Sequence, residues 1–352
     1  MVPNNSSDAA ATTTAAPATN KTKTASESDV YDRQIRLWGA EAQKKMQNSK
    51  VLYIHVTGGS SEVLKNLCLA GIKAEICDPR PASHLDSSPC FFTHPNNSSD
   101  GAEQQQQKKL KFDSVAHAVR PLVEELNPLL GSCPIVEKQP SELTKEDLKG
   151  YIVVVASQIN LNLAVRLSKL LAEGSVLYTI DCFGMCGASM IDFGTGEERF
   201  RYRPEQGKKL LDPTPLKDKV PLSEMVKVPL HKATNRFHKK GPPPIWVMYR
   251  ALLEYQDSTG NWLGDEGVDT DRAKEKIQEF LKEQQASLTD EELDNLVTAG
   301  MAQVAPVCAV LGGMIGNEVI KIISGKGEPA NNTLLLDGRT CKAWTFLVKA
   351  KE

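Results

Sequence analysis

From about residue 32 onward, the spacing of apolar residues alternates between the period of a helix and that of a strand. Residues 32–48 place Ile35, Leu37 and Trp38 on one apolar side, behind an Asp32 that suits a helix cap. Two apolar runs at 50–56 and 73–77 predict strands, and the helical spacing between them closes at Gly71. Strand, helix and strand in this order predict the start of a parallel sheet.

The alternation is interrupted once and then resumes. Residues 79–109 are polar and of low complexity, with too little apolar surface to offset the cost of ordering, so they predict a disordered insertion. The segments that follow predict a helix at 113–126, a short strand near 134–137, a buried strand at 151–156, a helix over 160–173 and a strand at 175–181. The fold class predicted is α/β, a Rossmann-like, doubly wound and mostly parallel sheet.

The remaining segments predict an inserted helical part and a return to the sheet. Residues 186–203 resemble an antiparallel pair turning at 194–196, and 204–244 lacks periodicity, as a surface linker would. Three helices follow as a separate cluster, the third after a capping box at 289–292. A long apolar helix over 303–323 then precedes two C-terminal antiparallel strands at 332–337 and 341–348. The predicted organisation is a disordered tail at 1–28, an α/β domain at 29–203, a linker at 204–244, a helical segment at 245–300, and a helix with strands completing the domain at 301–352.

Charge and cysteine content exclude several function classes. The net charge of −2 gives no basic footprint for nucleic acid or an anionic membrane. The most apolar stretch, 304–316, is shorter than the ~18 residues of a membrane span. The eight cysteines have no CxxC spacing, so they predict buried, reduced thiols, and neither a zinc site nor any other metal site is expected.

Four segments carry a resemblance to a known family. They are YDRQIRLWGAEAQKKMQNSKVL at 31–52, SEVLKNLCLAGIK at 61–73, EELNPL at 124–129 and APVCAVLGGMIGNEVIKIISGKGEPANN at 305–332. The chain resembles the activating enzymes of ubiquitin-like proteins, and in particular the small, non-thioester subunits of the SUMO branch. The resemblance implies a nucleotide-binding α/β half that pairs with a larger catalytic subunit. The pair adenylates SUMO with Mg-ATP and then captures it on a cysteine thiol.

The resemblance also indicates which parts of that machinery the chain lacks. The four glycines of the family's GxGGxG turn fall at His55, Thr57, Gly58 and Ser60, so only one of them remains. Side chains at the other positions obstruct close approach of phosphates. Asp78 resembles the ribose-binding carboxylate, but residues 157–160, after the strand at 151–156, hold no carboxylate for magnesium. The site at Gly58, Gly59 and Asp78 is therefore expected to be non-functional.

Arg33, in the YDRQ run, is the residue that the resemblance makes catalytic. In this family that arginine crosses the dimer interface to the ATP phosphates of the partner's site, and Arg36 is placed to assist. Mg-ATP is then held mainly by the larger subunit, and this chain alone is expected to be inactive. No thioester cysteine is expected, because the linker at 204–244 contains no Cys. The resemblance implies that the protein resides in the nucleus, and the cytoplasm stays open as a second location.

Three alternatives stay open on the sequence. The corresponding subunit for the modifier of cullins also begins with such a run, although it carries a larger helical insertion than 204–300 allows. A partnerless pseudoenzyme scaffold is a second alternative, and a self-sufficient homodimeric adenylating enzyme is disfavoured by the missing glycines. For Arg33 itself, the ordinary alternative is a surface arginine paired with a carboxylate.

Overall fold

The computed structural model describes residues 30–86, 88–93, 112–194, 200–206, 209–233 and 241–349. The predicted tail at 1–28 lies outside these residues, as does most of the predicted insertion. The part of the insertion that is described is folded: a 3-10 turn, η1 (Ala82–Leu85), precedes Cys90 and Phe92, which are both buried. The prediction of disorder is therefore wrong for this part, because two apolar side chains among the polar ones reach the core.

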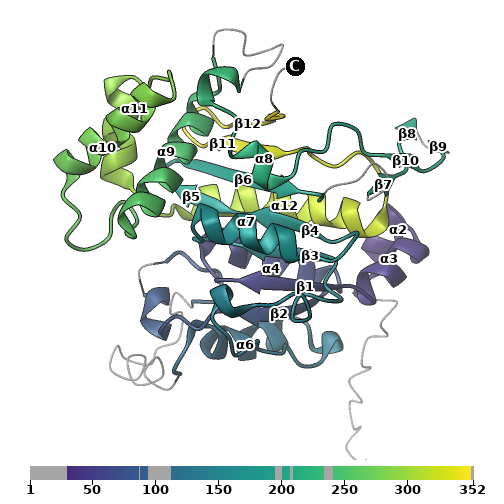
Figure 1. Cartoon of the computed structure of the whole chain (residues 1–352). Coiled ribbons are helices and arrows are strands. Elements are labelled where there is room, and N and C mark those ends of the chain that lie inside the picture. The colour runs from purple at the N-terminus through teal and green to yellow at the C-terminus, as the bar shows by residue number, and fades with distance from the viewer. Residues whose placement is uncertain are drawn as a thin grey trace, which may run out of the picture.

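An eight-stranded, mostly parallel sheet forms the centre of the molecule, which confirms the predicted fold class (Figure 1). The order is β12-β11-β6-β4-β3-β1-β2, with β5 paired to β6. Strands β2, β1, β3 and β4 are parallel to one another, and β6, β11 and β12 are antiparallel to their neighbours. The bounds are β1 (Lys50–Ile54), β2 (Lys73–Cys77), β3 (Val153–Ala156), β4 (Val176–Thr179), β5 (Asp181–Phe183), β6 (Cys186–Asp192), β11 (Thr333–Asp337) and β12 (Lys342–Thr345).

Helices cover both faces of the sheet, and the strands bury alternate residues on each. Val51 and Tyr53 of β1 face one apolar core, whereas Leu52 and Ile54 face the other. The first core is closed by α4 (Gly58–Leu69), α6 (Val115–Leu126) and α12 (Ala305–Ser324), and the second by α7 (Leu161–Leu170), α8 (Leu222–Met225) and α9 (Pro244–Thr259). Burial on both sides explains why these strands read as continuous apolar runs.

Helix α12 packs closely on α4, and a glycine lies at the contact. A Cβ added at Gly312 would lie 2.4 Å from Glu62 Cβ and 3.0 Å from Gly59 O, whereas one at Gly313 would meet nothing within 4 Å. Gly312 therefore fits the contact with α4, while Gly313 faces open space. Of the described helices, α12 alone is long and apolar enough to span a membrane, but 61% of its most apolar stretch is buried inside the protein.

The N-terminal helix predicted at 32–48 is two helices. Gly39, with a φ of 86°, separates α2 (Asp32–Trp38) from α3 (Ala40–Gln47). Helix α2 buries none of its side chains, and Leu37 is 78% exposed. The expected apolar side is thus covered only in part: Trp38 packs against the core and Ile35 is half-buried, whereas Leu37 is left exposed by the described part of this chain.

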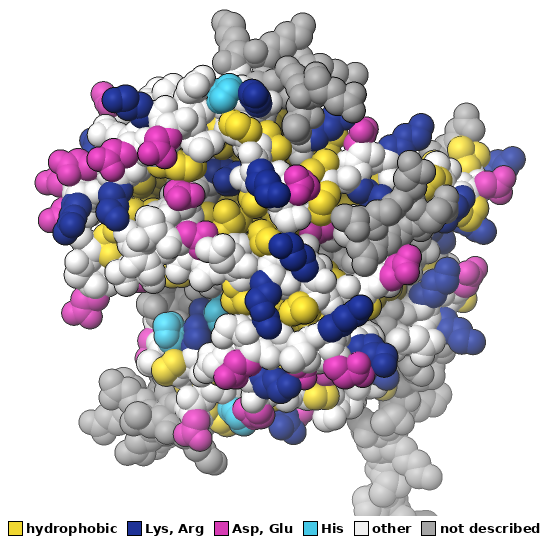
Figure 2. Space-filling model, viewed as in Figure 1, with side chains coloured by type: hydrophobic (Ala, Val, Ile, Leu, Met, Phe, Trp, Pro, Cys, Tyr) yellow, Lys and Arg dark blue, Asp and Glu magenta, His cyan; other side chains and the backbone are white. Residues whose placement is uncertain are grey.

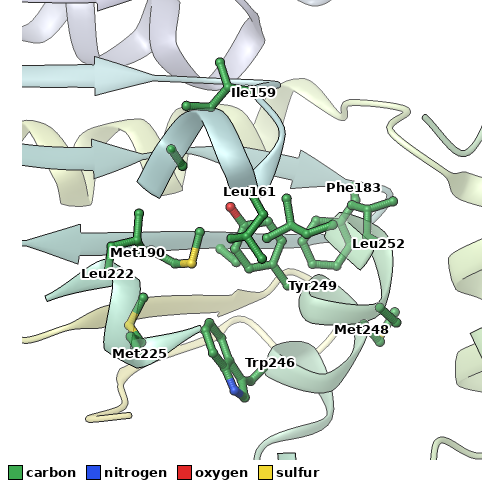
Figure 3. Close-up of a cluster of buried hydrophobic side chains, with 14 of the residues drawn as sticks. Ile159, Leu161, Phe183, Met190, Leu222, Met225, Trp246, Met248, Tyr249 and Leu252 are labelled. Atoms are coloured by element: carbon green, nitrogen blue, oxygen red, sulfur yellow. The ribbon is translucent and has the colours of Figure 1, made fainter. Parts of the chain in front are cut away.

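Two predictions for the middle of the chain are wrong. Residues 186–203 do not form one hairpin: β6 turns back on β5 through Gly184 and Met185, and β7 (Arg201–Tyr202) pairs with β10 (Thr214–Pro215). The expected surface linker includes two further short strands, β8 (Glu205–Gln206) and β9 (Lys209–Leu210), and it enters the core. Figure 3 shows its Leu222 and Met225 in one apolar cluster with Trp246 and Tyr249 of α9.

Helix α9 also departs from the predicted separate cluster. It packs on the sheet itself, where Tyr249 stacks on Phe183 of β5 at 5.9 Å between ring centroids. The other two helices, α10 (Thr270–Glu283) and α11 (Asp290–Ala299), pack on α9, and the capping box of Thr289 and Glu292 is present as predicted. The strand predicted near 134–137 is reduced to one bridge between Ile135 and Ile76.

Candidate nucleotide site and N-terminal helix

The turn from β1 into α4 satisfies its own polar groups. Thr57 caps α4: its N–H donates to Ser60 Oγ at 2.8 Å, and the Thr57 hydroxyl accepts from the Ser60 N–H. The Thr57 hydroxyl also lies 2.8 Å from Ser157 Oγ, at the end of β3. Thr57 and Ser60 stand at two of the family's glycine positions, so side chains of this chain take the place that a phosphate oxygen has at an open helix N-terminus.

A glutamine from a distant segment fills the space above the first turn of α4. Gln303 Oε1 accepts the Gly58 N–H at 2.7 Å. A Cβ at Gly58 would lie 2.5 Å from that oxygen, 2.8 Å from Cys308 Sγ and 2.9 Å from Pro89 Cγ. Gly59 similarly faces the side chain of Ile180. Gly58 and Gly59 thus let neighbouring side chains of the same chain approach the turn.

Asp78 has no oxygen available for a ribose. Its buried carboxylate accepts the Val56 N–H at 2.7 Å and forms a two-point ion pair with Arg80, with Nε to Oδ1 at 2.9 Å and Nη2 to Oδ2 at 2.8 Å. The same guanidinium donates to Gln158 Oε1 at 3.0 Å. Asp78 and Gln158, from the ends of β2 and β3, are therefore joined to each other through Arg80.

His55 replaces the first glycine of the turn and keeps its backbone shape. Its φ is 60°, a left-handed conformation that glycine adopts without cost. Nδ1 donates to Ser157 O at 3.0 Å, since a carbonyl oxygen can only accept. Burial, and then the charge of Arg80, lower the pKa of His55 to about 4, so the ring is neutral at physiological pH and offers no charge to a phosphate.

Asp181 is a second buried carboxylate near this turn, and it too is engaged. It accepts from Tyr249 Oη and from the Gln158 N–H, both at 2.7 Å. Burial raises the pKa of Asp181 to about 6. Within the described part of the chain, no group of three or more His, Cys, Asp or Glu side chains is placed to hold a metal ion. The residues at this turn do not fit Mg-ATP, because internal contacts occupy the phosphate and ribose positions and residues 157–160 hold no carboxylate for magnesium.

The half-buried His55 makes the stability of the fold depend on pH. The unfolded chain takes a proton at His55 near pH 6.5 and the folded one only near 4, so the free energy of unfolding falls as the pH drops through this window. We expect this protonation of His55 to lower the free energy of unfolding at pH 5 by about 2 kcal/mol relative to its value at neutral pH. Asp181 acts with the opposite sign, since its raised pKa favours the folded state as the pH falls below about 6.

Urea unfolding of wild type and His55→Asn at pH 7.5 and pH 5 isolates the contribution of His55 to the free energy of unfolding, because both proteins contain Asp181. Asn tolerates the left-handed φ. The variant is expected to lose less stability between the two pH values than the wild type. The exposed His84 provides the matched control, His84→Asn. Equal pH dependence in wild type and His55→Asn would contradict the assignment.

Arg33 lies far from this turn. Gln34, its neighbour in α2, donates from Nε2 to Leu69 O at 2.9 Å, at the last residue of α4, whereas the turn is at the first residue. Since α4 has 12 residues, its two ends are roughly 18 Å apart. Figure 1 shows α2 and α3 together at one side of the sheet. The structure therefore does not bring Arg33 to Gly58, Gly59 or Asp78.

The two arginines of α2 differ in their surroundings. Arg36 pairs with Asp32 at 2.9 Å, one turn away. Arg33 is exposed and forms no ion pair with a carboxylate of the described residues. An unpaired guanidinium remains able to bind an anionic group presented by another molecule.

Several residues at the closed turn were not identified from the sequence. Arg80 follows Asp78 by two residues, and that spacing after a strand is a local signal for an Asp–Arg pair. Gln303 has no such signal, because it comes from a segment 245 residues away from Gly58.

The α/β sheet, its β1–α4 turn and the YDRQIRLWG segment at 31–39 agree with the resemblance to the activating enzymes of ubiquitin-like proteins. No family model matches the sequence. Curated relatives along nearly the whole chain are named SUMO-activating enzyme subunit 1, and the chain is homologous to them. The protein from Dictyostelium discoideum is 28% identical over 321 residues, which cover 89% of this chain and 90% of the relative. The protein from Xenopus tropicalis is 26% identical over 88% of this chain and 92% of the relative. Subunit 1B-1 from Arabidopsis thaliana is 28% identical over 91% of this chain and 95% of the relative.

Proposed function

We propose that the chain is the non-thioester subunit of a heterodimeric SUMO-activating enzyme and donates Arg33 to the ATP site of its larger partner. One observation carries the proposal most strongly: Arg33 forms no ion pair with the carboxylates of the described residues and stands on an exposed helix, at the opposite end of α4 from the chain's own filled turn. A functional Arg33 therefore has to act on another subunit. The names of the homologues support SUMO as the modifier.

The chemistry explains why a guanidinium is useful there. Adenylation of a carboxylate builds negative charge on the pyrophosphate that leaves, and a planar fork of N–H donors binds phosphate oxygens at two points. A donor that is fixed before the reaction stabilises this charge without reorganisation. Arg36 is tied to Asp32, and we assign it at most an assisting role.

The chain's thiols support a partner that supplies the thioester cysteine. Seven of the eight cysteines are buried, and only Cys341 is exposed. Burial raises the pKa of the thiols of Cys90 and Cys186 to about 11, and of Cys77 and Cys133 to about 12. A buried thiol with a raised pKa holds little nucleophilic thiolate at neutral pH. In the proposed pair the thioester forms on the larger subunit, and we place the pair in the nucleus, as the resemblance implies.

Reconstitution with the larger SUMO-activating subunit tests this function. We expect a one-to-one complex by size-exclusion chromatography with light scattering, and ATP-dependent thioester formation with SUMO. The modifier of cullins, run in parallel, is expected to give none. Failure to form the complex would favour a partnerless scaffold, and activation of the cullin modifier in place of SUMO would move the chain to that branch.

A further inference from the structure

The helix that carries Arg33 is held by polar contacts. None of its side chains is fully buried and Trp38 packs only partly against the core, so packing alone does not fix its direction. At its start, Tyr31 is buried and its hydroxyl accepts from Asn127 Nδ2 at 2.9 Å. In its middle, Gln34 binds Leu69 O. At its end, Lys326 Nζ donates to the backbone carbonyl of Trp38.

Lys326 itself is rigidly placed. It lies in the turn after α12, between Gly325 and Gly327, whose φ values of 69° and 76° define the turn. Arg203 holds this turn from both sides, since its N–H donates to Gly325 O at 2.8 Å and its carbonyl accepts from the Gly327 N–H at 2.9 Å. The ammonium group thus reaches α2 from a turn whose backbone is hydrogen-bonded to Arg203.

The position of the ammonium suits the end of a helix. The last carbonyls of α2 have no partner within the helix and carry partial negative charge, which a cation stabilises. Gly39, with a φ of 86°, ends α2 beside the ammonium: a Cβ built there would lie at ordinary contact distance, 3.6 Å from Lys326 Nζ. The nearby carboxylate of Glu41 pairs with Lys45 at 3.1 Å, which leaves Lys326 to the backbone of α2.

We propose that Lys326 is a positioning residue for Arg33: by fixing the C-terminal end of α2, it sets the direction in which the guanidinium enters the partner's site. The proposal rests on the proposed function of Arg33. Trp38 is five residues from Arg33 in a seven-residue helix, so a pivot at its end displaces the arginine. Small displacements of a charge-stabilising group can lower a rate by on the order of 100-fold.

Kinetics of the reconstituted pair test this role. We expect Lys326→Met to lower the kcat of ATP–pyrophosphate exchange about 10- to 100-fold, with the KM for SUMO unchanged. Lys326→Arg, which keeps a cationic donor, is expected to restore most of the rate. In an Arg33→Ala background, Lys326→Met is expected to have no further effect, because the group that it positions is gone. The exposed Lys169 of α7 gives the matched control, Lys169→Met.

The outcomes separate this inference from the function on which it rests. Full exchange by Arg33→Ala would overturn both. If Arg33→Ala lowers exchange but Lys326→Met leaves it unchanged, or lowers it equally in both backgrounds, only the positioning role is overturned. Each variant is first checked for a one-to-one complex, and Lys326→Gln replaces Lys326→Met if that variant does not pair.

Discussion

Replacing Arg33 with alanine is expected to lower ATP–pyrophosphate exchange by the reconstituted pair by on the order of 100- to 1,000-fold or more, the range found for the loss of one preorganised donor or of an arginine supplied by another subunit. The loss should appear mainly in kcat, because the donor acts where charge builds up in the transition state. Since Arg33 is exposed and has no ion pair with the described carboxylates, the thermal stability of the chain and its pairing should not change.

Matched arginine variants make this result specific. Arg272 is exposed near the start of α10, so Arg272→Ala removes a comparable charge from a helix at another place and is expected to keep full exchange. Arg33→Lys keeps the charge but loses the two-point fork, and it should recover only part of the rate. Arg36→Ala is expected to have a smaller effect, because Asp32 already engages Arg36. Full exchange by Arg33→Ala would show that the partner's site is complete without it.

The α/β class followed from the sequence because its signals are local. Apolar runs predicted the strands β1, β3 and β4, and the apolar periodicity over 303–323 predicted α12. The segment at 204–244 was misinterpreted for a physical reason: its buried residues, such as Leu222 and Met225, are spaced by prolines and lysines, so no period shows that they reach the core. Helix α9 was assigned to a separate cluster because an amphipathic pattern does not say which surface it covers.

The glycine turn was predicted less completely than the fold. The resemblance identified three glycine positions occupied by side chains, and the structure shows what those side chains do: Thr57 and Ser60 cap α4, and His55 keeps the left-handed turn. The groups that fill the turn come from elsewhere, above all Gln303. Contacts between segments hundreds of residues apart depend on the assembled fold, and one sequence does not reveal them.

The filled turn predicts that restoring the glycines does not restore a nucleotide site. The triple variant His55→Gly, Thr57→Gly and Ser60→Gly removes three obstructing side chains but leaves Gln303 over Gly58 and Arg80 on Asp78. It also removes the cap of α4, at a cost of about 1 kcal/mol. We expect the isolated triple variant to be less stable than the wild type and still without exchange activity.

The most direct test asks whether adenylation occurs at this chain's own turn or at the site of the larger subunit. It measures ATP–pyrophosphate exchange by the purified wild-type chain alone, with SUMO present and Mg-ATP raised to millimolar concentrations. If the chain's own turn is closed and Arg33 serves a partner, the isolated chain gives only the background rate, and addition of the larger subunit produces exchange that depends on Arg33. Saturable exchange by the isolated chain would contradict this, because it would require a working nucleotide site beside Gly58.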